Sequence, residues 1–251
     1  MTGRSSRLFR VALAAILGFL VVGCGAGGTP VPGYSPSLTP SPQQPTSPAQ
    51  SPTLPPAANP TAGWTEYEQP EDGFAIALPE SWRRIDPDPA SLASVLEVLR
   101  RQHPEVAALL ESAGQRLEGS DVRFIAFDLG PESMSSGFLT NLNVLHRPLQ
   151  SGTTLSSFGE ANVSELKRMA RLVTPVEQHA VQWPSGQALC LQYTLALGTQ
   201  EGQLADLSLT QFLVVHGQDG YVLTFATTPG QLARYAPIFE QIGRTFRLLK
   251  V

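Results

Sequence analysis

The chain from Trp64 to Val251 predicts a domain of the α/β (α+β) class, an α/β/α sandwich around a central antiparallel sheet. Several expected strands are apolar on both faces, as in sheets that are covered on both sides. Residues 122–129 give the pattern: Val122, Phe124 and Ala126 on one side, Ile125, Phe127 and Leu129 on the other. Consecutive strands are joined by short turns, which favours antiparallel pairing. Segments with helical spacing of apolar residues supply the outer layers.

Residues 1–23 predict an export signal. Three arginines and no acid stand in the first ten positions, and a stretch of twelve apolar residues follows. A permanent membrane helix needs roughly 20 apolar residues, so the shorter stretch is typical of a signal peptide. Gly23 followed by Cys24 resembles the lipobox of bacterial lipoproteins, in which the cysteine thiol receives a diacylglyceryl group. We therefore expect lipid attachment at Cys24 and anchoring to the extracytoplasmic face of a cell membrane.

Residues 24–63 predict a disordered tether between the lipid and the domain. From Gly25 to Gly63 the chain holds 11 of its 22 prolines, with almost no large aliphatic residue. Such a segment buries too little apolar surface to offset the entropy that ordering costs. As a flexible coil it spans roughly 35 Å. We interpret it as a passive spacer that holds the domain of residues 64–251 away from the membrane.

The domain begins with two expected strands, 64–69 and 74–78, around a turn that ends in Asp72 and Gly73. Two helices follow. Asp88 and Pro89 supply an N-cap and a proline at the first helical position, and Pro104 separates the first helix from a second. The apolar residues of the two helices recur at helical spacing: Leu92, Val95, Leu96 and Leu99, then Val106, Leu109, Leu110, Ala113 and Leu117.

The remaining elements alternate between strands and helices. Strands are expected at 122–129, 138–147, 187–197, 207–216 and 221–227. Ser157 and Glu160 have the spacing of a capping box, which predicts a helix that runs to about Leu172. The closing helix carries Leu232, Tyr235, Phe239, Ile242 and Phe246 on one face. Because Pro237 lies inside it, we expect its main part to start near Ala236.

Charge and cysteine content argue against a nucleic-acid-binding surface and against a disulfide in the domain. The net charge is −4, and removal of the signal leaves 14 basic against 21 acidic side chains, near −7. No cluster of basic residues is present, so we expect no nucleic-acid partner. With Cys24 lipidated, Cys190 has no partner for a disulfide, and the domain depends on its core for stability.

Three stretches resemble PsbP-like domains. Tyr67–Trp82 (YEQPEDGFAIALPESW) is similar to their opening hairpin, Gly220–Ala226 (GYVLTFA) to a late strand, and Tyr235–Phe246 (YAPIFEQIGRTF) to the closing helix. Members of that family include a photosystem II extrinsic subunit and actinobacterial lipoproteins, and most are binding or assembly proteins. The resemblance therefore implies a PsbP-like fold and an accessory domain without catalytic activity, and it transfers no functional residue.

Few side chains suggest a site. The four histidines lack metal-ligand spacing, so we expect no metal, no catalytic residue and no cofactor. Cys190 is interpreted as a small buried side chain. Asn141 and Asn143 share one face of an otherwise apolar strand, and His146 follows them, so these three are the candidate ligand-binding residues. Hydrogen bonding within the core is the alternative for the two amides.

Two functions fit these features. The first is a lipid-anchored, non-enzymatic accessory or adaptor domain that binds an envelope protein partner, which predicts an exposed apolar patch on a sheet edge or helix face. The alternative is a small-molecule carrier or sensor domain, which predicts a cavity of several hundred Å³ between sheet and helices with a few amides in its wall. An enzyme is the least favoured class.

Overall fold

A computed structural model of the chain describes residues 61–85, 97, 100, 122–136, 138–198 and 204–249. The signal sequence, most of the tether and nearly all of the two helices expected between 88 and 117 lie outside the described residues. Glu97 and Arg100, which belong to the first of these helices, are helical. Among the described residues, no helix has both the length and the apolar character needed to cross a bilayer.

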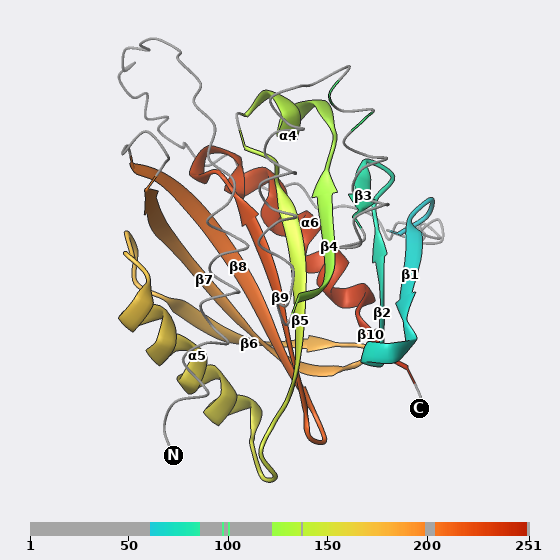
Figure 1. The fold of residues 1–251 in the computed structure, drawn as a ribbon, viewed down its shortest axis with the longest axis vertical. Coiled ribbons are helices and arrows are strands. Elements are labelled where there is room, and N and C mark those ends of the chain that lie inside the picture. Colours follow the sequence, from blue (N-terminus) through green and yellow to red (C-terminus); the bar gives the residue numbers. More distant parts are fainter. Residues whose placement is uncertain are drawn as a thin grey trace, which may run out of the picture.

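A large antiparallel sheet forms the centre of the domain (Figure 1). Its seven strands within the described residues lie in the order β3-β4-β5-β9-β8-β7-β6. Their bounds are β3 Trp82–Arg84, β4 Val122–Asp128, β5 Asn141–Pro148, β6 Glu177–Trp183, β7 Gly186–Gly198, β8 Leu204–His216 and β9 Asp219–Thr227. Strands β6 to β9 are consecutive hairpins, and β9 closes the series by pairing with β5. Antiparallel pairing, predicted from the short turns, is confirmed.

A second, smaller sheet has the order β1-β2-β10, with β1 Thr65–Gln69, β2 Phe74–Leu78 and β10 Arg247–Leu248. The turn between β1 and β2 is a 3₁₀ turn, η1 Pro70–Asp72, followed by Gly73 at φ 71°. Glycine adopts this left-handed conformation without steric cost, which is why the Asp-Gly pair predicted the turn correctly. The expectation of one sheet was incomplete, because the opening hairpin pairs with the C-terminal strand instead of joining the large sheet.

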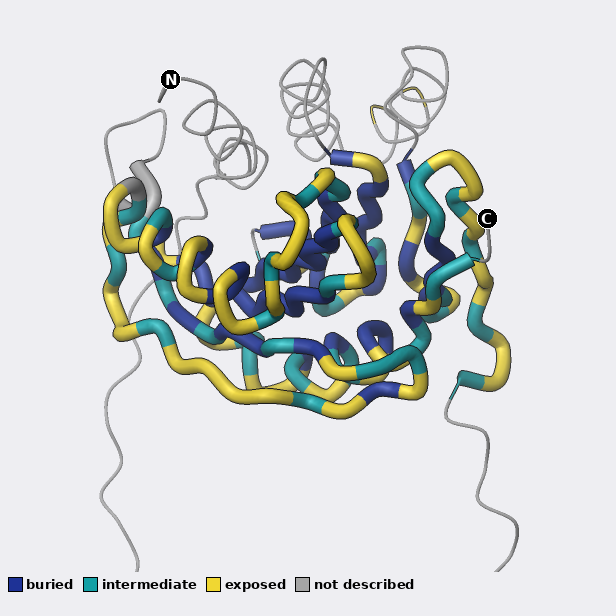
Figure 2. Tube along the Cα trace, turned by 90° about the horizontal axis from the view of Figure 1, so that it is seen from below, coloured by how far each residue is buried: buried dark blue, intermediate teal, exposed yellow. Residues whose placement is uncertain are grey.

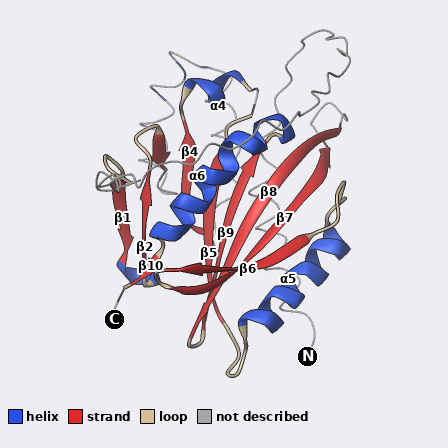
Figure 3. Cartoon of the chain, turned by 180° about the vertical axis from the view of Figure 1, so that it is seen from behind, coloured by secondary structure: helices blue, strands red, loops and turns tan. Residues whose placement is uncertain are grey.

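Helices cover opposite faces of the large sheet (Figures 1 and 3). Helix α5 Leu155–Met169 contacts β7 and β8 on one face, and α6 Leu232–Thr245 contacts β8 and β9 on the other. The short helix α4 Pro131–Ser135 joins β4 to β5, and the 3₁₀ turn η2 Pro229–Gln231 precedes α6. The predicted arrangement of helix, antiparallel sheet and helix is therefore confirmed, with the small sheet sharing the α6 face.

The two faces of the large sheet carry separate hydrophobic cores. The core on the α6 face includes Phe74, Ile76, Leu78, Trp82, Phe124, Leu142, Phe212, Phe225, Tyr235, Phe239, Ile242 and Phe246. The core on the α5 face includes Ile125, Phe127, Leu145, Phe158, Leu166, Leu191, Leu209, Leu213 and Val222. Buried segments accordingly lie on the inner sides of the layers and exposed segments on the outer sides (Figure 2). This is the arrangement that strands apolar on both sides require.

Three local expectations were wrong, each for a physical reason. Val122 lies in the α5-face core and not with Phe124, because a β-bulge between them shifts the register against β5. The capping box of α5 is formed by Thr154 and Ser157, so Ser157 is the third helical residue and not the cap. Helix α6 is continuous through Pro237, because the loss of one N–H donor near its start does not outweigh the packing of its buried face.

Four short elements, β3, β6, β10 and α4, were not predicted. Strand β6 is mostly exposed and has no alternation of apolar residues, which is typical of an edge strand. Strand β3 and helix α4 have only three and five residues, too few for a periodic pattern.

The close approach of α6 to the large sheet depends on Gly243. A Cβ atom added there would lie 2.5 Å from Cζ2 of the buried Trp183 ring. We expect Gly243→Ala to lower the free energy of unfolding by about 1–3 kcal/mol, because the rigid ring has to shift. Gly230→Ala is the matched control, since no atom lies within 4 Å of its Cβ position. Urea denaturation of both full-length variants measures the difference, and equal stabilities would contradict the packing described.

Candidate functional site

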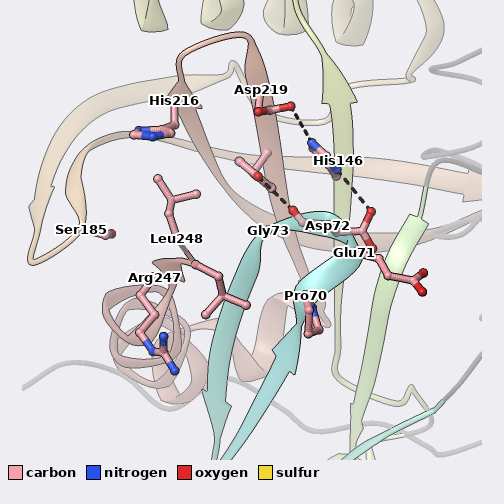
Figure 4. Close-up of a pocket in the computed structure, with 12 residues that line it drawn as sticks. Pro70, Glu71, Asp72, Gly73, His146, Ser185, His216, Asp219, Arg247 and Leu248 are labelled. Carbon is pink, nitrogen blue, oxygen red and sulfur yellow. Dashed lines mark hydrogen bonds and ion pairs between the residues drawn. The ribbon is translucent and has the colours of Figure 1, made fainter. Parts of the chain in front are cut away.

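A groove lies at the end of the domain where three hairpin turns meet β10 (Figure 4). Its walls come from the β1–β2, β6–β7 and β8–β9 turns, from β10 and from the end of β5, and its volume is about 890 Å³. We call it the end groove and define it by Asp72, His146, Ser185, His216, Asp219 and Arg247. Four of these six residues lie on strands, and Asp72 and Ser185 lie in short turns, so the groove has walls of well-defined shape.

His146 is held between two carboxylates in this groove. Its Nδ1 lies 3.3 Å from Oδ1 of Asp72, and its Nε2 lies 2.9 Å from Oδ1 of Asp219. Its ring stacks on Tyr221, which is the directly opposite residue on β9, with centroids 4.7 Å apart and planes 9° from parallel. The position and orientation of the imidazole are therefore fixed by three neighbours from η1 and β9 (Figure 4).

Tyr221 connects the histidine to the opening hairpin. Its hydroxyl donates a hydrogen bond of 3.0 Å to the backbone carbonyl of Asp72. Burial raises the pKa of Tyr221 to about 12, and the carboxylates of Asp219 and Asp72 act in the same direction. The phenol is therefore a protonated hydrogen-bond donor at neutral pH.

Arg123 completes the cluster, with its Nε 3.2 Å from Oδ1 of Asp72. It occupies the β-bulge of β4, where β5 has no residue opposite it. Bulges change the direction of a side chain relative to the regular alternation of a strand. The alternating pattern of residues 122–129 therefore gave no indication that Arg123 belongs to the site.

Arg247 lies on the rim of the groove. Its guanidinium donates to Glu66 Oε1 at 2.7 Å and to Glu68 Oε1 at 2.8 Å. These carboxylates come from β1 and the arginine from β10, and both strands pair with β2. The ion pairs therefore tie the two outer strands of the small sheet together across β2. All three side chains are about half exposed, so we expect these pairs to contribute little to stability.

The polar side chains of the end groove differ in whether they already have partners. Both ring nitrogens of His146 already contact carboxylates, so neither is available to take a proton from a bound molecule. No hydrogen bond joins Ser185 to His216 in the described part of the chain, as a nucleophile and its base require. No group of three or more histidine, cysteine or acidic side chains suited to a metal ion occurs among the described residues.

The residues that were predicted to form a site do not converge. His146 faces the end groove, whereas Asn141 and Asn143 lie on the other face of β5, in the interior toward α5. The Asn141 side chain donates to the carbonyl of Leu139 at 2.9 Å, which is hydrogen bonding within the core. Oδ1 of Asn143 is buried without a partner, and ligand binding there stays a prediction. Cys24 lies outside the described residues.

Comparison with known proteins finds solved structures whose fold is similar to that of this chain. No family model matches the chain, and no curated protein matches it. Among solved structures, the cyanobacterial PsbP protein CyanoP of Synechocystis sp. PCC 6803 is 13% identical with a TM-score of 0.45, over 79% of this chain and 99% of that one. LpqN of Mycobacterium tuberculosis, involved in cell envelope biogenesis, is 9% identical with a TM-score of 0.43, over 77% of this chain and 88% of that one.

The raised pKa of Tyr221 has a consequence for alkaline stability. As the pH rises, the unfolded chain loses this phenolic proton first, at its ordinary pKa of 10.0. The stability that Tyr221 contributes is therefore fully present below about pH 10 and is lost as the pH rises through about 12. Between these values we expect the free energy of unfolding of Tyr221→Phe to fall less steeply than that of the unchanged protein.

At about pH 8 the same variant is expected to be less stable by about 0.5–1.5 kcal/mol, because the bond to the Asp72 carbonyl is lost. Urea denaturation of the full-length proteins from about pH 8 to about pH 12 tests both expectations. Parallel curves between about pH 10 and pH 12 would show that folding does not raise the pKa of Tyr221.

Proposed function

We propose that the chain is a lipid-anchored, extracytoplasmic accessory domain without catalytic activity, and that it binds an extended segment of an envelope protein partner in the end groove. The partner-binding part of this proposal is based on the open edge of β10. The groove contains the open edge of β10, a strand whose residues Arg247 and Leu248 line it. An open strand edge offers backbone donors and acceptors to which an extended chain adds as a further strand.

The register of β10 identifies the backbone groups at this edge. The N–H of Leu249 donates to the carbonyl of Gly73 at 2.8 Å, and Leu248 lies opposite Phe74 on β2. In an antiparallel pair, hydrogen-bonded and non-hydrogen-bonded positions alternate along each strand. The N–H and C=O of Leu248 therefore point away from β2. Within the described residues β10 pairs with β2 alone, so this edge carries no other strand.

Polar side chains in the walls of the groove can contact the side chains of such a segment. His146, fixed between Asp72 and Asp219, gives one polar wall, and Ser185 and His216 lie on the other side (Figure 4). Fixed groups lose little conformational entropy when a partner binds, so a short segment is enough for a specific contact.

The exposed apolar patch expected of an adaptor is not found in the described part of the chain. Val173, 51% exposed, is the single large hydrophobic residue that is exposed there. The described surface therefore does not support a hydrophobic interface with a partner protein. Backbone pairing in a polar groove is the mode of partner binding that fits the surface better, and it is typical of transient contacts.

The anchoring part of the proposal rests on the sequence before the domain, and it can be tested by metabolic labelling with palmitate. We expect the full-length chain to incorporate the label and to lose residues 1–23. Cys24→Ala should take no label and keep these residues, as measured by intact mass. Cys190→Ala is the matched control, because it removes the buried cysteine and leaves the lipobox unchanged. Labelling of Cys24→Ala would contradict the assignment.

The partner-binding part is tested by photocrosslinking in native membranes. The full-length chain carries benzoylphenylalanine in place of Ser185, on the wall of the groove, and a second version carries it in place of the exposed Glu160 on α5. We expect a defined crosslinked protein from position 185 and not from position 160. The same product from both positions, or from position 160 alone, would contradict binding in the end groove.

Leu248 distinguishes strand addition from other contacts. Leu248→Pro removes the outward N–H without removing a bond to β2, so we expect it to abolish the crosslink from position 185. Leu248→Ala keeps the N–H and should keep the crosslink. Thermal unfolding of both variants checks that the domain remains folded. Retention of the crosslink in Leu248→Pro would show that the partner does not pair with β10.

A further inference from the structure

A second hollow, separate from the end groove, lies between α6 and the strands β6, β7 and β8, with a volume of about 390 Å³. We call it the helix pocket. Its apolar wall is formed by Val181, Phe212, Ala236 and Pro237. On the helix side the pocket is lined by the small residues Ala233 and Ala236 and by Pro237, whereas the large residues Tyr235, Phe239 and Ile242 of α6 are buried in the core. This volume is within the range of sites that bind small molecules, about 300–1,000 Å³.

Thr210 introduces a polar group at the floor of the pocket. The residue is 2% exposed, and its hydroxyl has no hydrogen-bond partner. It lies on the α6 face of β8, opposite Gln192 on β7, which also lines the pocket. A buried hydroxyl without a partner is costly, and rotation about χ1 exchanges it with the methyl group. The floor therefore offers a donor and acceptor to a molecule that enters.

Helix α6 supplies a further acceptor. Pro237 has no N–H, so the carbonyl of Ala233 lacks the donor that an α-helix normally provides four residues later. Ala233 and Pro237 both line the pocket. The wall of the helix pocket is thus apolar with a few hydrogen-bonding groups, which is the composition of sites that orient a small ligand.

The titratable side chains that line the helix pocket limit the charge of the molecules that it can bind. Burial, together with the Glu240 carboxylate, raises the pKa of the Cys190 thiol to about 12, so the thiol stays protonated and is a poor nucleophile. Glu240 lines the pocket and is paired with Arg244, whose guanidinium donates to it at 2.7 Å. The residues that line the pocket include Glu240 but no lysine or arginine, so the wall offers no cationic side chain of these types to a negatively charged molecule. His179, on the β6 side, is exposed to solvent.

We propose that the helix pocket binds a small, neutral, mainly apolar molecule with one hydrogen-bonding group, oriented by the hydroxyl of Thr210. This site is independent of the end groove, because it shares no lining residue with it. Neither site needs the other, and each proposal can fail alone.

Two fluorescent probes with the same aromatic skeleton test the proposal. N-phenylnaphthylamine is neutral with one N–H, and anilinonaphthalene sulfonate adds a negative charge. We expect the full-length chain to bind one molecule of the neutral probe saturably, with fluorescence enhancement, and to bind the anionic probe at least about tenfold more weakly. Absence of saturable binding, or equal binding of both probes, would overturn the proposal.

Variants assign the binding to this pocket. Ala236→Leu fills it and should abolish binding, whereas the matched control Ala161→Leu, an exposed position on α5, should leave binding unchanged. Thr210→Val keeps the shape and removes the hydroxyl, so we expect binding about three- to tenfold weaker without loss of thermal stability. Unchanged binding in Ala236→Leu or in Thr210→Val would overturn the assigned pocket or the assigned role of the hydroxyl.

Discussion

The packing of α6 against the large sheet is the interaction on which the rest of the domain depends. Phe239 is fully buried, stacks on Phe225 of β9 with ring centroids 4.7 Å apart, and meets Trp82 of β3 edge to face. The hydroxyl of Tyr235, one turn earlier, donates to the buried carboxylate of Asp128 at the end of β4. One helix face thus joins strands from three separate parts of the chain into one core.

This packing also positions the end groove. Phe246 follows directly after α6, stacks on Phe74 of β2 with centroids 5.5 Å apart, and contacts Tyr221 of β9 at 5.4 Å. Strand β10 begins at the next residue, so the end of the helix fixes where the open strand edge lies. His146 stacks on the same Tyr221 ring. Aromatic rings of the core therefore support the strands that line the polar groove, while Asp72 and Ser185 are supplied by turns.

The sequence predicted the elements with clear periodicity and missed those determined by tertiary contacts. The strand at 207–216 follows from its many apolar residues, and the buried face of α6 follows from apolar residues at helical spacing. The pairing of β10 with β2 could not be predicted, since β10 has two residues and its partner is about 170 positions away in the chain. His146 was identified as a candidate, but its neighbours were not. Asp72 belongs to a turn, and Arg123 belongs to a bulge that interrupts the pattern.

The two halves of α6 differ in how they contact the sheet, and this difference separates the two proposed sites. The second half, from Phe239 to the helix end, is filled by large buried side chains and by Trp183 against Gly243. A closely packed segment of this kind has one arrangement, so it does not slide when a small molecule enters elsewhere. The first half buries Tyr235 in the core, but it also carries Ala233, Ala236 and Pro237 over the helix pocket. Coupling between two sites requires an element with two alternative packings. The packed half of α6 lies between the helix pocket and β10 along the chain and has no such alternative, so occupancy of the pocket and binding in the end groove are expected to be independent.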